Sequence, residues 1–264
     1  MESTNNNTKE IIGLIAGSGK LPEVLASAIK DRSEFSLIGL GISGEAESSL
    51  KKYTDEFYFF NVTELEHLKE IIRKEKIKKI IMAGKVHKDI LLKGVQLDDK
   101  AAHIINFLNN KGDYHILKAF ASDFEKDGVH FLDPTFFLGH LIPTTGTLTK
   151  KYPSREESED VHFGFPIARK IAELDIGQTI VVKNRIVLAV EGIEGTDEAI
   201  KRGGELGKGS GIVIKVTKPH QDLRFDMPVI GEDTLRIAKK SGITCIAVES
   251  HKIIIIDKEK VIKE

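Results

Sequence analysis

The residues best suited to chemistry gather between positions 218 and 231, in the sequence KPHQDLRFDMPVIG. Two carboxylates, Asp222 and Asp226, and the guanidinium of Arg224 lie close together between two prolines that restrict the backbone. If this stretch is extended, alternation places all three side chains on one side of the chain. Carboxylate oxygens suit a hard divalent cation, and a planar guanidinium suits phosphoryl oxygens. The segment predicts a loop that binds metal and phosphate, with a surface turn held by an Asp–Arg ion pair as the alternative.

A glycine turn near the N-terminus is a second candidate. Gly17-Ser18-Gly19 follows the apolar run 11–16 and precedes a helical pattern over 20–30. Amides at such a strand–turn–helix junction commonly hold phosphate. Pro22 stands where a dinucleotide fingerprint has its third glycine, and Leu21 stands where a P-loop has Ser or Thr. The turn therefore matches neither standard fingerprint, and a tight turn without a ligand is the alternative.

A basic turn around Lys85 follows the predicted strand 79–83. Ligands of open α/β sheets bind outside the carboxyl ends of the strands, so Lys85 is expected on the same rim as the glycine turn. A solvated basic turn is the alternative. No acid closes the second strand, 35–40, to hold a ribose, which disfavours NAD.

Three acids occupy the sequence EGIEGTD, which follows a predicted strand at 186–190. Glu191, Glu194 and Asp197 could supply metal oxygens or a general base, or they could serve a helix terminus through capping and the macrodipole. Thr196 or Asp197 is the expected cap of the helix that follows. Lys215 lies in the next apolar strand, 211–216.

Hydrophobic periodicity predicts an α/β protein with two domains. Strands alternate with helices in the first half, which implies a Rossmann-like parallel sheet, and the second half reads as a distinct mixed α+β domain. We expect a disordered leader at 1–10, an N-terminal domain at 11–133, a linker or hinge at 134–159, and a C-terminal domain at 160–264 that carries the catalytic loop. The predicted helices of the first half are 20–30, 63–75, 98–109 and 113–126, with Thr63 capping the second. In the second half, hairpins are predicted between strands 179–182 and 186–190, and between strands 243–248 and 252–256.

The composition excludes several classes of protein. The 264 residues contain 39 basic and 40 acidic side chains, so no charge excess points to nucleic acid. The single cysteine, Cys245, rules out an intramolecular disulfide and is interpreted as a packed thiol. The polar start of the chain and the lack of a long apolar run predict a cytoplasmic protein without a membrane span.

Five motifs occur in an order that resembles one known family. They are GLIAGSGKLP from Gly13, AGKV from Ala83, LDIGQ from Leu174, EGTD from Glu194, and RFDMPVIG from Arg224. Together they resemble the LpxI-type UDP-2,3-diacylglucosamine pyrophosphatases of lipid A biosynthesis. The resemblance covers nearly the whole chain from Ile11 onward.

The resemblance implies a metal-dependent hydrolase that cleaves UDP-2,3-diacylglucosamine to UMP and 2,3-diacylglucosamine 1-phosphate. It implies Asp226 as the essential acid, assisted by Asp222, and Mg2+ or Mn2+ as the cofactor. The candidate metal ligands are Asp226, Asp222, Glu191, Glu194 and Asp197. The candidate substrate and phosphate contacts are Gly17, Ser18, Gly19, Lys85, Gln178, Thr196, Lys215, Gln221 and Arg224.

The diacylated substrate also implies transient contact with the inner membrane surface. The sequence leaves both a monomer and a homodimer as alternatives. Three alternatives remain. The chain could hydrolyse another nucleotide-linked sugar, or it could sense a nucleotide ligand without catalysis. A Rossmann oxidoreductase is the least favoured, because of Pro22 and the missing ribose acid.

Overall fold

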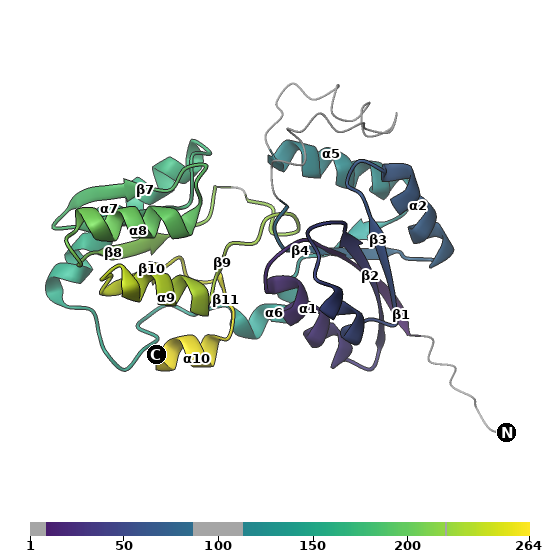
Figure 1. Cartoon of the computed structure of the whole chain (residues 1–264), viewed down its shortest axis with the longest axis horizontal. Helices are drawn as coiled ribbons and strands as arrows, with labels where there is room; N and C mark the ends of the chain where they lie inside the picture. The colour runs from purple at the N-terminus through teal and green to yellow at the C-terminus, as the bar shows by residue number, and fades with distance from the viewer. Residues whose placement is uncertain (1–8, 87–112, 220) are drawn as a thin grey trace. The chain divides into compact units, whose positions relative to one another are not determined.

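The computed structural model describes residues 9–86, 113–219 and 221–264 (Figure 1). The chain divides into two compact units. Unit 1 is Met1–Leu138 together with Leu223–Asp226, and unit 2 is Gly139–Asp222 together with Met227–Glu264. The α/β two-domain architecture is confirmed. The predicted catalytic loop does not belong to the C-terminal domain as a whole, because four of its residues are part of unit 1.

Unit 1 is built on a five-stranded parallel sheet in the order β3-β2-β1-β4-β5. The strands are β1 (Glu10–Ala16), β2 (Phe35–Ile42), β3 (Glu56–Phe60), β4 (Lys79–Ala83) and β5 (His130–Phe131). The helices are α1 (Leu21–Lys30), η1 (Ser48–Tyr53), α2 (Leu65–Lys74), α5 (Asp113–Lys126) and α6 (Thr135–Leu138). The sheet matches the predicted Rossmann-like pattern.

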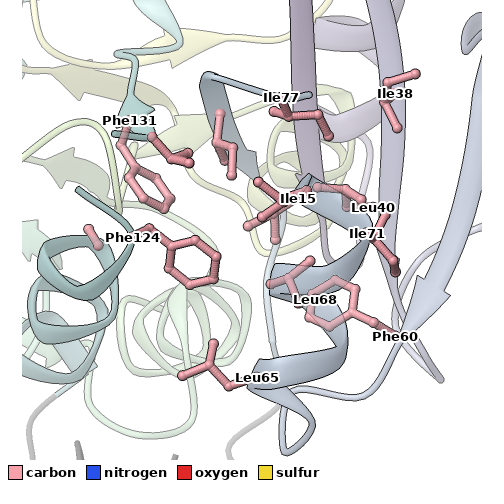
Figure 2. Packing of buried hydrophobic residues seen from close by; sticks show 14 of the residues in the cluster. Ile15, Ile38, Leu40, Phe60, Leu65, Leu68, Ile71, Ile77, Phe124 and Phe131 are labelled. Atoms are coloured by element: carbon pink, nitrogen blue, oxygen red, sulfur yellow. The ribbon is translucent and has the colours of Figure 1, made fainter. Parts of the chain in front are cut away.

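The core of unit 1 follows from the alternation along its strands. Ile15 of β1 and Leu40 of β2 pack with Leu68 of α2 and Phe124 of α5, and Figure 2 shows these side chains converging between the sheet and the two helices. All four are at most 3% exposed, so this face of the sheet is closed by α2 and α5.

Two predictions for unit 1 differ from the structure, and a third falls outside the described residues. The leader was expected to reach residue 10, but Glu10 pairs with Phe35 in β1, and residues 1–8 lie outside the described part. The predicted helix 98–109 also lies outside it. The predicted Thr63 cap is wrong, because Glu64 holds the N-cap position of α2 without a side-chain hydrogen bond. The helix begins one step later because Leu65, only 3% exposed, is drawn into the core.

Unit 2 contains a four-stranded sheet in the order β10-β8-β6-β7. Its strands are β6 (Thr179–Lys183), β7 (Ile186–Val190), β8 (Ile212–Lys215) and β10 (Cys245–Val248). Helix α7 (Arg155–Glu173) packs on one face, and α8 (Thr196–Leu206) and α9 (Glu232–Lys240) pack on the other. A small parallel pair, β9 (Val229–Ile230) and β11 (Ile254–Ile255), lies with η2 (Gly139–Leu141) and α10 (Lys258–Lys263) in the same unit. None of the helices in the described ranges is long and apolar enough to cross a bilayer.

One predicted hairpin is confirmed and the other is wrong. Strands β6 and β7 pair antiparallel around Asn184 and Arg185, which both adopt positive φ. Strand β10 instead pairs parallel with β8, and β11 pairs parallel with β9. The periodicity of these two runs predicts strands correctly, but it does not specify which partners bury them.

The predicted linker 134–159 is divided between the units. Phe137 of α6 packs edge to face on Phe35 in unit 1, with ring centroids 5.3 Å apart. In unit 2, Lys258 Nζ donates to the carbonyl oxygens of His140 and Ile142 at 3.1 and 3.0 Å. Ser154 then begins α7 with a capping box. The chain therefore passes from one unit to the other at Leu138–Gly139, without a long free linker.

The glycine turn and the Lys85 turn are joined at the carboxyl end of β1 and β4. Ser18 N donates to Lys85 O at 2.8 Å, and Lys85 N donates back to Ser18 O at 2.9 Å. Gly17 N donates to Ala83 O at 2.9 Å. A Cβ at Gly17 would lie 2.3 Å from Lys85 O, so only glycine permits this approach.

A carboxylate fixes the point where the chain leaves β8. Thr217 N and Oγ1 each donate to Glu249 Oε2 at 2.9 Å. Arg169 Nη1 lies 3.1 Å from both carboxylate oxygens and 3.2 Å from Thr217 O. Thr217 is 1% exposed, so this network anchors the start of the 218–231 segment below the surface.

We predict that Gly17→Ala destabilises unit 1 by roughly 1–3 kcal/mol, because the new methyl group collides with the Lys85 backbone. Gly139→Ala is the control, since a Cβ there has no neighbour within 4 Å, and its effect is expected to stay below about 0.5 kcal/mol. Urea unfolding measures both. Equal stability of the two variants would contradict the tight approach of the two turns.

We predict that Glu249 makes stability depend on pH. Burial alone would raise the pKa of Glu249, but hydrogen bonds from Thr217 and Lys252 and the charge of Arg169 hold it below the ordinary 4.5. A lowered folded pKa gives stabilisation that is complete above 4.5 and is lost as pH falls through the folded pKa.

Urea unfolding from pH 7 down to about pH 3.5 tests this sign. Wild type is expected to lose stability more steeply than Glu249→Gln over the acid part of the range. Glu173→Gln, which changes a 60% exposed side chain of the same unit, should follow wild type. Parallel pH curves for wild type and Glu249→Gln would contradict the prediction.

Candidate functional site

Three strand ends of unit 2 converge on a cluster of polar side chains. The register pairs Thr179, at the start of β6, with Lys215, at the end of β8. It also pairs Ile180 with Val190, at the end of β7. The residues just beyond these ends, Gln178 and Glu191, therefore meet at one edge of the sheet, together with the first turn of α8.

The cluster is a chain of hydrogen bonds centred on Thr196. Lys215 Nζ donates to Thr196 Oγ1 at 2.8 Å and lies 3.4 Å from Thr179 Oγ1. Thr196 Oγ1 donates to Glu191 Oε1 at 2.7 Å, and the backbone N–H of Gln178 donates to Glu191 Oε2 at 3.2 Å. Sequence reasoning named Gln178, Glu191, Thr196 and Lys215, and the structure brings all four together.

The cluster combines a buried cation with the carboxylate of Glu191. Lys215 is only 7% exposed and Thr179 is fully buried, so the ammonium group has little water around it. The N-terminus of α8 begins at Thr196, behind an N-cap glycine with φ of 85°. A buried cation, a hydroxyl and the amide end of a helix are the usual partners of a phosphate group.

Glu194 and Asp197 make other interactions than the hydrogen bonds of this cluster. Glu194 Oε1 accepts from Arg202 at 2.6 Å, and Glu194 Oε2 accepts from Gly192 N at 3.1 Å. Its own backbone N–H and the Arg202 side chain lower the pKa of Glu194. Asp197 lies in the first turn of α8, where an acid complements the macrodipole. The expected cap is wrong, because Gly195 is the N-cap residue and Thr196 bonds to Glu191 instead.

The 218–231 segment does not run as one extended strand. Its first part is held in unit 2, where Lys218 N donates to Gln221 Oε1 at 2.8 Å and Lys218 pairs with Asp175. Leu223–Phe225 then form a turn. The expected alternation of Asp222, Arg224 and Asp226 is therefore wrong, and Asp222 belongs to unit 2 while Asp226 belongs to unit 1.

Leu223–Asp226 is anchored on unit 1 by an aromatic ring and an ion pair. Phe225 packs against the core of unit 1, with its ring centroid 6.0 Å from that of Phe131. Arg224 lies over the Phe225 ring and donates to Glu125 Oε1 of α5 at 3.1 Å. Arg224, predicted to contact phosphate, thus has a carboxylate partner, and the turn presents Asp226 with an exposed side chain.

The predicted phosphate contacts in unit 1 are also brought together, as the joined turns of Gly17, Ser18 and Lys85. The amides of Gly17 and Ser18 donate to Ala83 O and Lys85 O, so these two N–H groups are used inside the protein. Gly19, with φ of 95°, leads into the uncapped N-terminus of α1. Lys85 itself is exposed.

The five predicted metal ligands do not form a preassembled cluster. Within the described ranges, no group of three or more histidine, cysteine or acidic side chains could hold a metal ion. Glu191 and Glu194 already accept hydrogen bonds from Thr196 and Arg202. The residues as arranged do not fit a metal site made by protein groups alone.

Sequence reasoning missed the Arg169–Thr217–Glu249 network. Glu249 directly follows β10, as Glu191 follows β7. An acid immediately after a predicted strand was therefore the sequence signal that could have identified Glu249. Arg169 lies within α7, and its position there has no feature that separates it from other polar residues of an amphipathic helix. Cys245 fits its predicted role as a packed thiol, because burial raises its pKa to about 11 and keeps it protonated.

Comparison with known proteins agrees with this division into two parts. Residues 11–141 match the LpxI N-terminal domain, and residues 144–264 match the LpxI C-terminal domain. The UDP-2,3-diacylglucosamine pyrophosphatase LpxI of Caulobacter vibrioides is 30% identical over 262 residues, covering 95% of this chain and 92% of the relative.

A solved structure, the biotin carboxylase domain of the Hydrogenobacter thermophilus 2-oxoglutarate carboxylase, overlaps 74% of this chain at 13% identity. The overlap spans 41% of that protein at a TM-score of 0.29, which is too low to carry an argument. The two domain matches and the full-length relative decide the assignment, and the chain belongs to the LpxI family.

Proposed function

We propose that this chain hydrolyses the pyrophosphate bond of UDP-2,3-diacylglucosamine, giving UMP and 2,3-diacylglucosamine 1-phosphate for lipid A biosynthesis. The observation that carries the proposal is the match of both LpxI domains, in order, together with a relative of that name aligned over 95% of the chain. The polar cluster of unit 2 supports it, because pyrophosphate hydrolysis requires groups that neutralise phosphoryl oxygens.

In this proposal Lys215 and Thr196 bind a phosphoryl group. Lys215 Nζ carries three N–H donors, so it can contact a phosphate oxygen while it holds Thr196 Oγ1 at 2.8 Å. Thr196 contributes its backbone N–H at the start of α8, because its hydroxyl proton is donated to Glu191. Glu191 accepts the Thr196 proton and thereby fixes the orientation of that hydroxyl. Because the ammonium is buried, its attraction to a phosphate is screened less than that of a surface lysine. Gln178, beside Glu191, completes this subsite.

Asp226 is proposed as the catalytic acid–base group. Its carboxylate is exposed at the end of the turn that Phe225 anchors, so it can accept a proton from an attacking water. Asp222 and Gln221 are proposed to assist from the other part of the segment. The joined turns of Gly17–Gly19 and Lys85 are proposed as further substrate contacts.

Mg2+ or Mn2+ dependence is part of the proposal. Mg2+ is commonly bound by one or two carboxylates plus substrate phosphates, so Asp226 with pyrophosphate oxygens would suffice as its anionic partner. The ion would neutralise charge on the phosphoryl oxygens. We also propose a cytoplasmic location, with transient contact at the inner membrane through the acyl chains of the substrate. The proposal covers both a monomer and a homodimer.

We predict that purified protein releases UMP from UDP-2,3-diacylglucosamine in the presence of Mg2+ or Mn2+, and that EDTA stops the reaction. Asp226→Asn should lower kcat by roughly 10²-fold or more, because loss of a general base typically costs that much. Asp233→Asn, at an exposed acid of α9, is the control. UDP-N-acetylglucosamine, assayed in parallel, tests the alternative of another nucleotide-linked sugar. No UMP from folded wild-type protein would refute the proposed substrate.

We predict that Lys215→Met lowers kcat/KM by about 10²-fold, chiefly through KM, since it removes a buried charge that contacts phosphate. Lys183→Met is a matched control, because Lys183 Nζ bonds to Gly207 O at 2.7 Å at the other end of β6. Its activity should stay within about threefold of wild type. Equal losses in the two variants would argue for a structural role of Lys215.

A further inference from the structure

Large apolar side chains are exposed beside the polar cluster of unit 2. Leu174, Ile176 and Ile193 are 69%, 51% and 92% exposed. Leu174 and Ile176 lie between α7 and β6, and Ile193 lies between β7 and α8. These loops leave the same edge of the sheet as Glu191 and Thr196.

The two loops are in direct contact, so the three exposed residues are carried on neighbouring segments of unit 2. A Cβ at Gly177, next to Ile176, would lie only 2.0 Å from the carbonyl oxygen of Glu191, two residues before Ile193. Gln178 N also donates to the Glu191 carboxylate. We call the surface of Leu174, Ile176 and Ile193 the apolar rim.

The charges around the apolar rim are compensated in pairs. Asp175 pairs with Lys218, and Glu194 pairs with Arg202. Just before the rim, Lys170 Nζ lies 3.6 Å from Glu173. The surroundings of the apolar rim therefore carry little net charge. The rim exposes hydrocarbon side chains to water, and no excess charge beside it favours a partner with a charged surface.

A shallow cavity of about 380 Å³ lies beside α7, and Glu173 of its lining directly precedes Leu174 in the chain. Phe165, Pro166 and Pro219 supply its apolar lining, and Arg169, Lys170 and Glu173 supply its charged groups. Arg169 pairs with Glu249 and Lys170 pairs with Glu173, so the cations of this cavity are compensated as well.

We propose that the apolar rim docks this protein on a lipid bilayer surface, with Leu174, Ile176 and Ile193 entering the boundary between headgroups and acyl chains. The inference rests on the proposed function, because a substrate with two acyl chains resides in such a surface. It adds the residues that make the contact, and it brings the Lys215–Thr196 subsite to the lipid where the substrate is held. Because the surrounding charges are paired, docking depends on hydrocarbon and only weakly on anionic lipid.

The test is vesicle flotation of the full chain, without substrate. A rim variant carries Leu174→Ser, Ile176→Ser and Ile193→Ser. The matched control carries Ile186→Ser and Leu206→Ser, which remove apolar side chains 62% and 58% exposed at the opposite edge of the sheet. Vesicles of phosphatidylcholine alone, and of phosphatidylcholine with phosphatidylglycerol, are used at low and high salt. Circular dichroism establishes that each variant is folded.

Wild type and the control variant are expected to float with both kinds of vesicle, at either salt concentration, with affinities within about twofold. The rim variant should bind at least about tenfold more weakly. Wild-type protein that does not float, or equal losses in the rim and control variants, would overturn the proposal. So would a wild-type dimer in sedimentation velocity that the rim variant converts to a monomer, since the rim would then contact a second copy.

An activity assay separates this proposal from the proposed function. The rim variant should hydrolyse a water-soluble short-chain analogue as fast as wild type and act at least about tenfold more slowly on the diacyl substrate in vesicles. Equal losses on both substrates would overturn docking as the role of the rim. Hydrolysis of neither substrate by wild type would refute the proposed function, while the flotation result would still decide the docking proposal.

Discussion

A buried ammonium group joins the strand ends of unit 2. Lys215 is 7% exposed, and an unpartnered charge at that depth would cost several kcal/mol. Thr179 and Thr196 supply the oxygens that it needs, and Glu191 holds Thr196 in place. Lys215 ends β8, and its partners come from two further strand ends and one helix start, so the contacts around one cation tie β6, β7, β8 and α8 together at this edge.

A second constraint concerns the turn that carries Asp226. The turn is fixed by the aromatic contact of Phe225 with Phe131 and by the ion pair of Arg224 with Glu125. An exposed ion pair contributes little stability, so the ring is the principal anchor and the ion pair sets its orientation. In the sequence RFD, Arg224 and Phe225 thus fix the turn, and Asp226 presents a carboxylate.

The sequence predicted the frame of the fold well, because apolar periodicity reports burial directly. The five strands of unit 1 and the β6–β7 hairpin follow from that signal and from turn residues such as Asn184. The pairing of the strands was not predictable in the same way. The apolar runs around Ile246 and Ile254 both have the pattern of a strand, but they pair with different strands. Alternation also failed at Arg224, because Leu223–Phe225 form a turn, in which the partly buried Phe225 ring packs on the core of unit 1, and alternation assumes an extended backbone.

The candidate site was partly predictable for the same reason. Glu191, Thr196 and Lys215 stand at strand ends, and strand ends of one sheet edge must meet. Glu249 and Arg169 also meet at that edge, but the contact joins a helix interior to a strand end 80 residues away, and no local pattern reports it. Their role is seen only in the hydrogen bonds to Thr217.

The inclusion of Leu223–Asp226 in unit 1 has a consequence for biosynthesis. The ion pair between Glu125 and Arg224 spans 99 residues, and most of unit 2 lies between its two ends. During translation, the ribosome must therefore make most of the second unit before the first can acquire its last aromatic contact. A nascent chain that ends near residue 141 lacks the Phe225 ring that packs on Phe131, so that contact can form only after the RFD turn has left the ribosome.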